Sequence, residues 1–273
     1  MPIATADLKA LARDMRVDVI RMIEAAGSGH PGGSLSVIDL LAVLYWKFLK
    51  HDPKNPDWPD RDRLILSKGH ACPALYTVMA YRGYFPKERL MTLRKLGSPL
   101  QGHPDRLRLP GIEFSSGSLG QGLSVGLGMT ISAKMDKAPW KTYVVLGDGE
   151  LQEGQCWEAL MAAPKFKLDN LVAIVDHNNG QIDGPVDWVM GIEPLEDKLR
   201  SFNWDVRSVD GHDLAAIEDA FARTQECADK PHAIVAKTIK GKGVSFMEND
   251  IAWHGSAPKK DDADKAVEDI RHG

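Results

Sequence analysis

The sequence has 273 residues, of which 43% are hydrophobic and 26% are charged. This composition is ordinary for a soluble globular chain, and the length suits a single α/β domain covering residues 1–273. The net charge of −4 and the isoelectric point near 6.1 argue against a general binder of nucleic acid. We therefore interpret the local run of Lys237, Lys240 and Lys242 as a solvated loop.

The cysteines and the hydropathy pattern bear on cellular location. Cys72, Cys156 and Cys227 are odd in number and lie far apart without Cys-x-x-Cys spacing, which predicts reduced thiols in a cytoplasmic protein. The first residues do not form a charged-then-apolar leader, and the longest apolar run, residues 40–46, is too short to span a bilayer. We expect no membrane segment.

Two helices are predicted at the start of the chain. The first is amphipathic, because apolar residues recur at helical spacing through residues 8–23. A glycine-rich loop, residues 27–33, follows and carries His30. The second helix, residues 34–48 with Ser34 as a candidate cap, is apolar on almost every side and is expected to be buried. A lone loop histidine is usually only exposed, so His30 by itself predicts little.

The next segments carry two more histidines. A predicted strand, residues 64–66, leads through a short loop into a helix that begins near His70. The helix dipole disfavours a charged histidine at that position, so His70 is a candidate neutral hydrogen-bonding group beside an anion, or simply a helix cap. The loop between residues 96 and 113 contains Gly102-His103-Pro104, which is a weak motif alone.

A small-residue helix is predicted from Ser115 through Ala133. Five glycines in this stretch, Gly117 among them, would each weaken an isolated helix by roughly 1 kcal/mol relative to alanine. Some neighbour must offset that cost. Either the helix packs closely against another element, or a ligand lies against its backbone.

The central part of the chain, residues 142–184, predicts a strand, a helix and a second strand. A buried strand, residues 143–146, ends at Gly147-Asp148-Gly149, and a helix with Trp157, Leu160 and Met161 on one face follows. The second buried strand, residues 171–175, ends at residues 176–180. Consecutive strands joined in this way run parallel through a right-handed crossover. Both polar clusters then emerge at the same sheet edge, where open α/β sheets bind ligands.

The residue types in these clusters indicate a magnesium diphosphate site. Asp148 offers a carboxylate oxygen and Asn178 an amide oxygen, and such oxygens suit magnesium held jointly with phosphates. Gly147 and Gly149 allow a bulky anion to approach the backbone, and the following helix N-terminus favours negative charge.

Three other interpretations compete with this one. A dinucleotide fingerprint would need a third glycine where Gln152 stands, and Asp176 lies farther along than the usual acidic residue. A Walker A loop would need Gly-Lys-Ser/Thr, which the segment lacks. The plain alternative is a tight turn and a solvated loop, which is less convincing when both clusters flank one crossover.

The rest of the chain completes the fold prediction. Residues 204–209 and 232–237 read as two more strands, with a helix from Asp213 to Cys227 between them. Residues 259–273 form a charged C-terminal tail that we expect to be partly disordered. The alternation predicts an α/β fold, a parallel sheet with helices on both faces.

Several segments resemble one enzyme family. Gly147-Asp148-Gly149, a spacer of nearly thirty residues and a closing Asn178-Asn179 look like the thiamine-diphosphate signature. The sequence motifs at residues 147–154, 28–32, 67–72 and 101–104 are similar to those of transketolases in particular. The matching segments run in order from the first helix to about Pro258. The resemblance implies the thiamine-diphosphate-binding fold, as its pyrophosphate-type domain.

The resemblance also implies roles for individual residues. The implied metal ligands, for Mg2+, are Asp148, Asn178 and the carbonyl of Gly180. The implied contacts to thiamine diphosphate are His70, Gly117, Leu119, Gly149, Glu150, Asn178 and His254. The implied catalytic residues are His30 and His254 for proton handling and His103 for orienting the donor sugar.

Transketolases carry two further domains, one of which binds the pyrimidine ring, and the sequence shows no counterpart of either. The chain therefore resembles the N-terminal subunit of a split transketolase. With a C-terminal subunit it would transfer a two-carbon ketol unit from a ketose phosphate donor to an aldose acceptor. A heterotetramer is expected by analogy with the dimeric family.

Two alternatives stay open at this stage. One is a different thiamine-diphosphate carboligase, similar to 1-deoxyxylulose-5-phosphate synthase and using pyruvate, although the Gly102-His103-Pro104 segment favours ketol transfer. The other is a non-catalytic subunit that kept the fold. A nicotinamide-dependent dehydrogenase is a distant third.

Overall fold

The computed structural model describes residues 3–226 and 228–273. Its helices are α1 (Thr5–Ala26), α2 (Pro31–Val43), α3 (Cys72–Arg82), α4 (Gln121–Asp136), α5 (Gly154–Lys165), α6 (Val186–Met190), α7 (Leu195–Ser201), α8 (Leu214–Arg223) and α9 (Lys260–His272). Its strands are β1 (Arg63–Leu66), β2 (Thr142–Gly147), β3 (Leu171–His177), β4 (Gly180–Gln181), β5 (Gly184–Pro185), β6 (Asp205–Asp210) and β7 (His232–Lys237). The predicted thiol of Cys227 lies outside the described residues.

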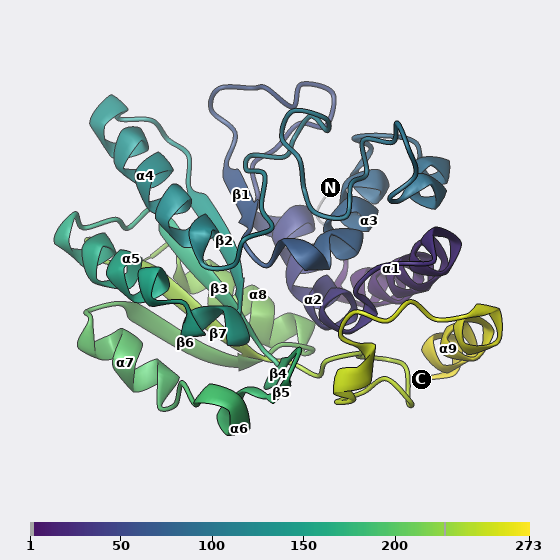
Figure 1. Ribbon diagram of the computed structural model, residues 1–273. Coiled ribbons are helices and arrows are strands. Elements are labelled where there is room, and N and C mark those ends of the chain that lie inside the picture. Colours follow the sequence, from purple (N-terminus) through teal and green to yellow (C-terminus); the bar gives the residue numbers. More distant parts are fainter. Residues whose placement is uncertain (1–2, 227) are drawn as a thin grey trace.

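In the described part of the chain, five strands form one parallel sheet in the order β1-β2-β3-β7-β6 (Figure 1). The predicted crossover is confirmed, because β2 and β3 are adjacent and Gly147 pairs in register with Asp176. The loops after β1, β2, β3 and β7 therefore leave the sheet at one edge. β4 and β5 form a small antiparallel hairpin just beyond β3.

Alternate residues of each strand enter two hydrophobic cores, because successive side chains point to opposite faces of a sheet. On β2, Tyr143 and Val145 join the core with α1, α2, α3, α8 and α9, whereas Val144 and Leu146 join the core with α4, α5 and α7. The predicted α/β fold with helices on both faces is confirmed.

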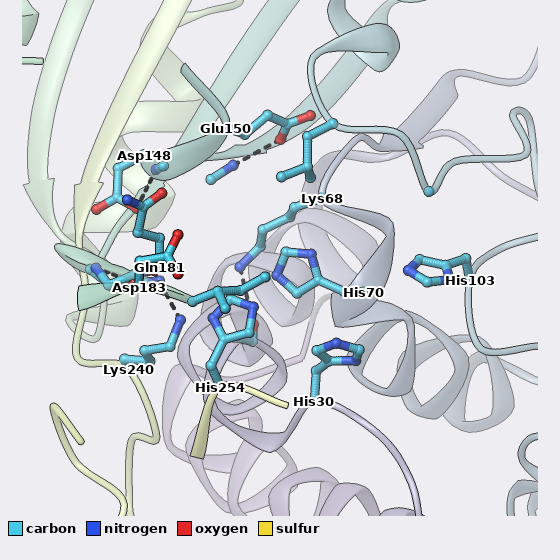
Figure 2. A pocket seen from close by; sticks show the side chains of 18 residues that line it. His30, Lys68, His70, His103, Asp148, Glu150, Gln181, Asp183, Lys240 and His254 are labelled. Carbon is cyan, nitrogen blue, oxygen red and sulfur yellow. Dashed lines mark hydrogen bonds between the residues drawn. The ribbon is translucent and has the colours of Figure 1, made fainter. Parts of the chain in front are cut away.

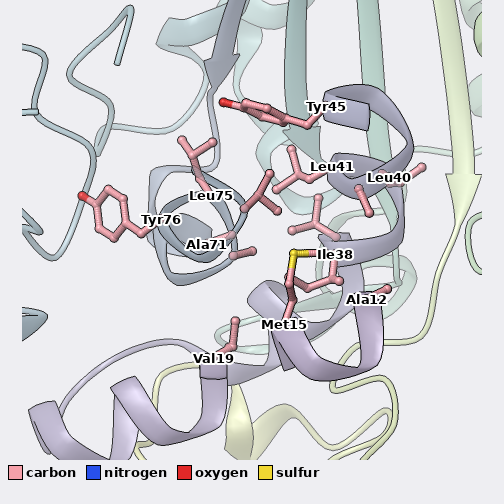
Figure 3. Packing of buried hydrophobic residues seen from close by; sticks show 14 of the residues in the cluster. Ala12, Met15, Val19, Ile38, Leu40, Leu41, Tyr45, Ala71, Leu75 and Tyr76 are labelled. Atoms are coloured by element: carbon pink, nitrogen blue, oxygen red, sulfur yellow. The ribbon is translucent and has the colours of Figure 1, made fainter. Parts of the chain in front are cut away.

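The N-terminal helices pack as their patterns predicted. Every residue of α2 is buried, and α1 and α3 lie against it; Figure 3 shows part of this packing, with Met15 of α1 beside Ile38 of α2. The predicted cap was wrong. α2 begins at Pro31, three residues before Ser34, with His30 in the N-cap position. Proline suits the first turn because its missing N–H has no partner there in any helix.

The glycines of α4 are explained by close packing against the sheet. A Cβ at Gly126 would lie 2.5 Å from Val144 Cγ2, and one at Gly122 would overlap Ser67. Gly120 has φ of +79°, a conformation that residues other than glycine rarely adopt, and α4 begins after it at Gln121. The helix therefore starts later than the predicted Ser115, and packing offsets the weak propensity.

One predicted apolar helix face is only partly buried, and the prediction for the C-terminal residues was wrong. Met161 of α5 is 55% exposed, because the buried face of that helix is formed by smaller residues and Leu160. Residues 259–273, predicted to be a partly disordered tail, instead form α9, which packs on α1 through Ala263, Ala266, Val267 and Ile270. The charges of this helix lie on its outer face, so charge density alone misled the prediction.

Among the described residues, Cys72 and Cys156 are buried free thiols, as predicted. No helix in residues 3–226 or 228–273 combines the length and apolar character needed to cross a bilayer.

Candidate functional site

A cavity of about 250 Å³ lies at the carboxyl edge of the sheet, where the loops after β1, β2, β3 and β7 meet the start of α2. It is lined by residues from segments spread between positions 30 and 254. All of the predicted site residues line it: His30, His70, His103, Gly117, Leu119, Asp148, Gly149, Glu150, Asn178, Gly180 and His254. The fold thus brings together every candidate, although their individual roles remain predictions.

The predicted metal ligands come from the two loops that the crossover joins. The backbone N–H of Asn179 donates to Asp148 Oδ2, and the N–H of Gly149 donates to Asp148 Oδ1 at 2.8 Å. Within the loop after β3, the N–H of Gly180 donates to Asn178 Oδ1 at 3.1 Å. These bonds fold both strand ends into one structure and leave a carboxylate, an amide oxygen and a carbonyl lining the same cavity.

The carboxylate of Asp148 is buried and lies near a second carboxylate, and both facts disfavour its negative charge. Burial, together with the nearby carboxylate of Asp176, raises the pKa of Asp148. A cation beside Asp148 would offset both effects. In the described residues no three His, Cys, Asp or Glu side chains are arranged to hold a metal ion by themselves. A divalent ion here would therefore draw on neutral oxygens and on phosphate as well.

A buried ion pair stands behind these loops. The ammonium of Lys68, just after β1, contacts the carboxylate of Asp176 on β3, and both side chains are at most 2% exposed. Asp176 also accepts from the hydroxyls of Ser36, at 2.6 Å, and Thr238. These partners hold the pKa of Asp176 below its ordinary value against the cost of burial. Asn178 Nδ2 donates to the same carboxylate at 3.0 Å, which orients its amide oxygen.

Lys240 corrects a prediction. It was interpreted as part of a solvated loop, yet its side chain is 2% exposed and its Nζ donates to the carbonyl of Gly180 at 3.0 Å. Burial and the neighbouring Lys68 lower the pKa of Lys240 to about 8. Of the three lysines predicted to be solvated, Lys237 at the end of β7 is exposed, whereas Lys242 is partly buried.

Four histidines converge on the other side of the cavity (Figure 2). The ring centroid of His30 lies 5.3 Å from that of His70, 6.3 Å from His103 and 5.7 Å from His254. The rings of His70 and His254 are 5.2 Å apart. In Figure 2, Asp148, Gln181 and Lys240 lie opposite His103, with Lys68, His70 and His254 between them.

The histidines are uncharged at neutral pH. Burial, followed by the charge of Arg94, lowers the pKa of His30 to about 4. Burial and Lys240 lower the pKa of His254 to about 3, and burial with Lys68 takes that of His70 well below its ordinary value. The pKa of His103 is lowered by burial and by Arg94. Neutral imidazoles can both accept and donate protons, which makes the cluster suited to acid–base work.

Glu150 is buried and fully engaged with the protein. Its Oε1 accepts from the hydroxyl of Ser67 and from the N–H of Gly120 at 2.9 Å, and its Oε2 accepts from Gly147 N–H at 3.1 Å. Burial raises the pKa of Glu150 despite these bonds. The carboxylate thus ties the start of α4 to the ends of β1 and β2, which positions Gly117 and Leu119 at the cavity wall.

Lys68 and Lys240 line the cavity and Asp176 contacts Lys68 and Asn178 behind it, and the sequence did not identify these roles. Lys68 and Lys240 each follow a strand that ends at the binding edge, which is the signal that could have found them. A lysine in such a position is equally consistent with a solvated loop. Ile182 and Asp183 of the β4–β5 hairpin also line the cavity, and their two-residue strands carry no clear sequence signature.

Comparisons with known sequences give one family. The profile described as transketolase, thiamine diphosphate binding domain, matches residues 8–271. SqwG of Clostridium sp. strain MSTE9, which belongs to a 6-deoxy-6-sulfo-D-fructose transketolase, is 48% identical over 248 residues, covering 91% of this chain and 90% of that one. One of the subunits of the apulose-4-phosphate transketolase of Phocaeicola vulgatus is 41% identical over 270 residues, covering 99% of this chain and 95% of that one.

Solved structures agree. A transketolase from Campylobacter jejuni has a TM-score of 0.93 at 35% identity, covering 98% of this chain and 43% of that one. A transketolase from Pichia stipitis in complex with sedoheptulose-7-phosphate has a TM-score of 0.91 at 32% identity, covering 98% and 41%. This chain therefore spans less than half the length of these solved transketolases, but nearly the whole of the separate subunits. By profile, sequence identity and fold, the chain belongs to the transketolase family, as a subunit that matches its thiamine-diphosphate-binding domain.

Proposed function

We propose that this chain binds Mg2+ and thiamine diphosphate and, with a partner subunit that carries the pyrimidine-binding domain, transfers a two-carbon ketol unit from a ketose to an aldose. The observation that carries the proposal is the single cavity lined by all the residues that the family motifs pointed to. One wall offers oxygens for a cation, and the other offers neutral histidines for a sugar.

The donor set fits magnesium. Asp148 would supply a carboxylate oxygen, Asn178 its amide oxygen and Gly180 its backbone carbonyl, and phosphate oxygens would complete the coordination. The Gly180 carbonyl accepts one hydrogen bond from Lys240 Nζ, and its second lone pair would be available to a cation. Lys68 and Lys240 add positive charge at the cavity wall, where an anionic diphosphate would lie.

The cavity also fits thiamine diphosphate, which when bound supplies the electron sink for breaking and forming carbon–carbon bonds. Gly117, Leu119 and Gly149 line the cavity and would offer backbone groups to it. His70, which lines the same cavity, would donate to the diphosphate. His254 Nδ1 is buried without a hydrogen-bond partner in the described structure, as expected of a group that contacts a ligand.

The histidines would handle protons and orient the sugar. His30 and His254 are uncharged at neutral pH and 5.7 Å apart, so either could remove a hydroxyl proton from the donor and return a proton to the acceptor. His103 lies across from His30 and is less buried than His70 and His254, which suits a contact to the donor sugar.

The names of the relatives support an anionic substrate. One relative belongs to a 6-deoxy-6-sulfo-D-fructose transketolase and another to an apulose-4-phosphate transketolase, and each named sugar carries an anionic group. We infer that the donor of this protein is a ketose with a phosphate or other anionic group. The partner subunit would hold that group, and two copies of each subunit would form a heterotetramer.

Reconstitution tests the proposal. The tagged chain is co-expressed with a partner subunit that carries a pyrimidine-binding domain, and the purified complex is assayed with Mg2+, thiamine diphosphate, a ketose phosphate and an aldose acceptor. Ketol transfer that depends on both cofactors supports the proposal. Consumption of pyruvate in place of the ketose would indicate the other carboligase class. Cofactor binding without turnover of either donor would indicate a non-catalytic subunit.

A further inference from the structure

Arg94 lies between the loops that carry His30 and His103. Its Nη1 donates to the hydroxyl of Ser28 at 2.8 Å, and its Nη2 lies 3.5 Å from His30 Nδ1 and 3.4 Å from the carbonyl of Gly102. One guanidinium therefore contacts Ser28 and His30 in the first loop and Gly102, which precedes His103, in the second loop.

The backbone around Arg94 holds the side chain in this place. Arg94 has φ of +58°, a left-handed conformation that is uncommon for a residue with a side chain. Its N–H donates to the carbonyl of Leu100 at 2.8 Å, which closes the loop. On either side, Leu93 is fully buried and Lys95 Nζ donates to the carbonyl of Ala25 at 2.8 Å. The neighbours are thus anchored to the core and to α1, and Arg94 is turned toward the histidines.

Gly102 permits this close approach. A Cβ built at Gly102 would lie 2.9 Å from both Cζ and Nε of Arg94. Such a contact is too short for real atoms, so any larger residue would move the guanidinium. The glycine before His103 is therefore required by the position of Arg94.

The charge of Arg94 has no acidic partner among residues 3–226 and 228–273. Each hydrogen bond from its Nη atoms ends on a hydroxyl, a carbonyl or an imidazole, and its Nε is buried without a hydrogen-bond partner. An arginine donates hydrogen bonds and cannot accept them, so the 3.5 Å contact favours a His30 Nδ1 that turns a lone pair toward the guanidinium. A neutral His30 then carries its proton on Nε2.

We propose that Arg94 is a positioning residue for ketol transfer: it holds His30 in the tautomer with the proton on Nε2 and, together with burial, opposes a positive charge on His30 and His103. The inference rests on the proposed function of the same cavity. It assigns to Arg94 no contact with substrate or cofactor.

The electrostatics of the cluster support this role. Arg94 is the largest cause, after burial, of the lowered pKa of both His30 and His103. The other groups that face His30 are the rings of His70, His103 and His254 and the ammonium of Lys240. None of them bears a negative charge that would counter the guanidinium.

The first experiment follows the histidines directly in the purified chain, without substrate. NMR titration of protein with 15N,13C-labelled histidine, with His30 assigned from H30Q, reports its pKa and tautomer. In R94M the His30 pKa is expected to rise by about one unit and the fixed tautomer to be lost. R94K keeps the charge without the planar fork, so the pKa should stay low while the tautomer becomes mixed. R106M, an exposed arginine of the same loop region, is the matched control and should change neither.

G102A tests the geometry with Arg94 present. The added methyl displaces the guanidinium, so His30 in G102A should titrate as it does in R94M. If His30 kept its low pKa and its Nε2–H tautomer in folded R94M, the proposal would be overturned.

The second experiment uses the complex with the partner subunit. In R94M, kcat/KM is expected to fall at least about tenfold at neutral pH, with its acid limb shifted upward in step with the His30 titration. Binding of Mg-thiamine diphosphate should stay unchanged. A loss of rate without any shift of the acid limb would show that Arg94 has only a structural role. A wild-type complex without ketol transfer would refute the proposed function, while the NMR result would still decide the role of Arg94 in the histidine cluster.

Discussion

Lys68 and Asp176 form a buried ion pair that crosses the end of strand β2, which lies between β1 and β3. Lys68 follows β1 and Asp176 belongs to β3, so the two side chains meet over Gly147 at the end of β2. A Cβ at Gly147 would lie 3.6 Å from Lys68 Cδ, so the lysine stem covers that glycine closely. The pair thereby holds together the strand ends that are followed by Asp148 and Asn178.

Breaking this pair should strongly destabilise the protein. K68M or D176N alone leaves one buried polar group without its partner, and each should lower the free energy of unfolding by about 3–5 kcal/mol. The double variant should cost less than the sum of the two, because the partners are removed together. Urea unfolding measures all three. D197N, which breaks the exposed pair with Arg200, is the control and should cost no more than about 1 kcal/mol.

Asp148 should control metal-dependent cofactor binding. D148N keeps the size of the side chain but removes the only carboxylate among the proposed ligands, so calorimetric affinity for thiamine diphosphate with Mg2+ should fall more than about 100-fold in the complex. D187N on α6, an exposed carboxylate outside the cavity, is the matched control. If D148N retained magnesium-dependent binding, the metal assignment would be wrong.

His103 should affect the donor sugar and not the cofactor. H103A is expected to raise KM for the donor by about tenfold through the loss of a hydrogen bond, with affinity for thiamine diphosphate unchanged. Steady-state kinetics with varied donor, combined with cofactor titration, separates the two effects. Unchanged donor kinetics would remove His103 from the substrate site.

Stability should fall as the solution is acidified below pH 6.5. The folded-state pKa values of His30 and His254, about 4 and about 3, lie below the ordinary value of 6.5. Between those values the unfolded chain binds more protons than the folded chain, so stability decreases as pH falls through 6.5 and this loss ends below the folded-state pKa values. The double variant H30Q/H254Q should show a Tm less sensitive to pH in this window, by a few degrees. H272Q, at an exposed position, should keep the wild-type profile.

Helix α9 should contribute to the stability of the whole domain. Ile270 is 3% exposed and packs in the core beside α1, so I270A should lower the free energy of unfolding by about 2–5 kcal/mol. K265A, on the same helix and outside its buried face, should change it by less than about 0.5 kcal/mol. Equal, negligible effects of both variants would show that α9 does not belong to the folded core.

Much of this site could be predicted from local sequence. The apolar runs of β2 and β3 define two buried strands, and a crossover between parallel strands sends both strand ends to one edge. Asp148 and Asn178 follow those ends directly, so their meeting at one cavity needed no knowledge of distant contacts. The role of His30 was predicted only from the resemblance to the family motif, because a histidine in a loop has no physical signature of its own.

The tertiary structure alone decided which charges are buried and what they contact. Lys240 looked like a solvated lysine and α9 like a charged tail, yet one lies under the Gly180 carbonyl and the other covers α1. Arg94 meets His30 across 64 positions of sequence through a left-handed turn. Burial of a charge depends on partners that the fold supplies from distant segments, whereas strand order and loop placement follow from local periodicity. For that reason the sequence by itself determined where the site lies, and the packing of the folded chain determined its electrostatics.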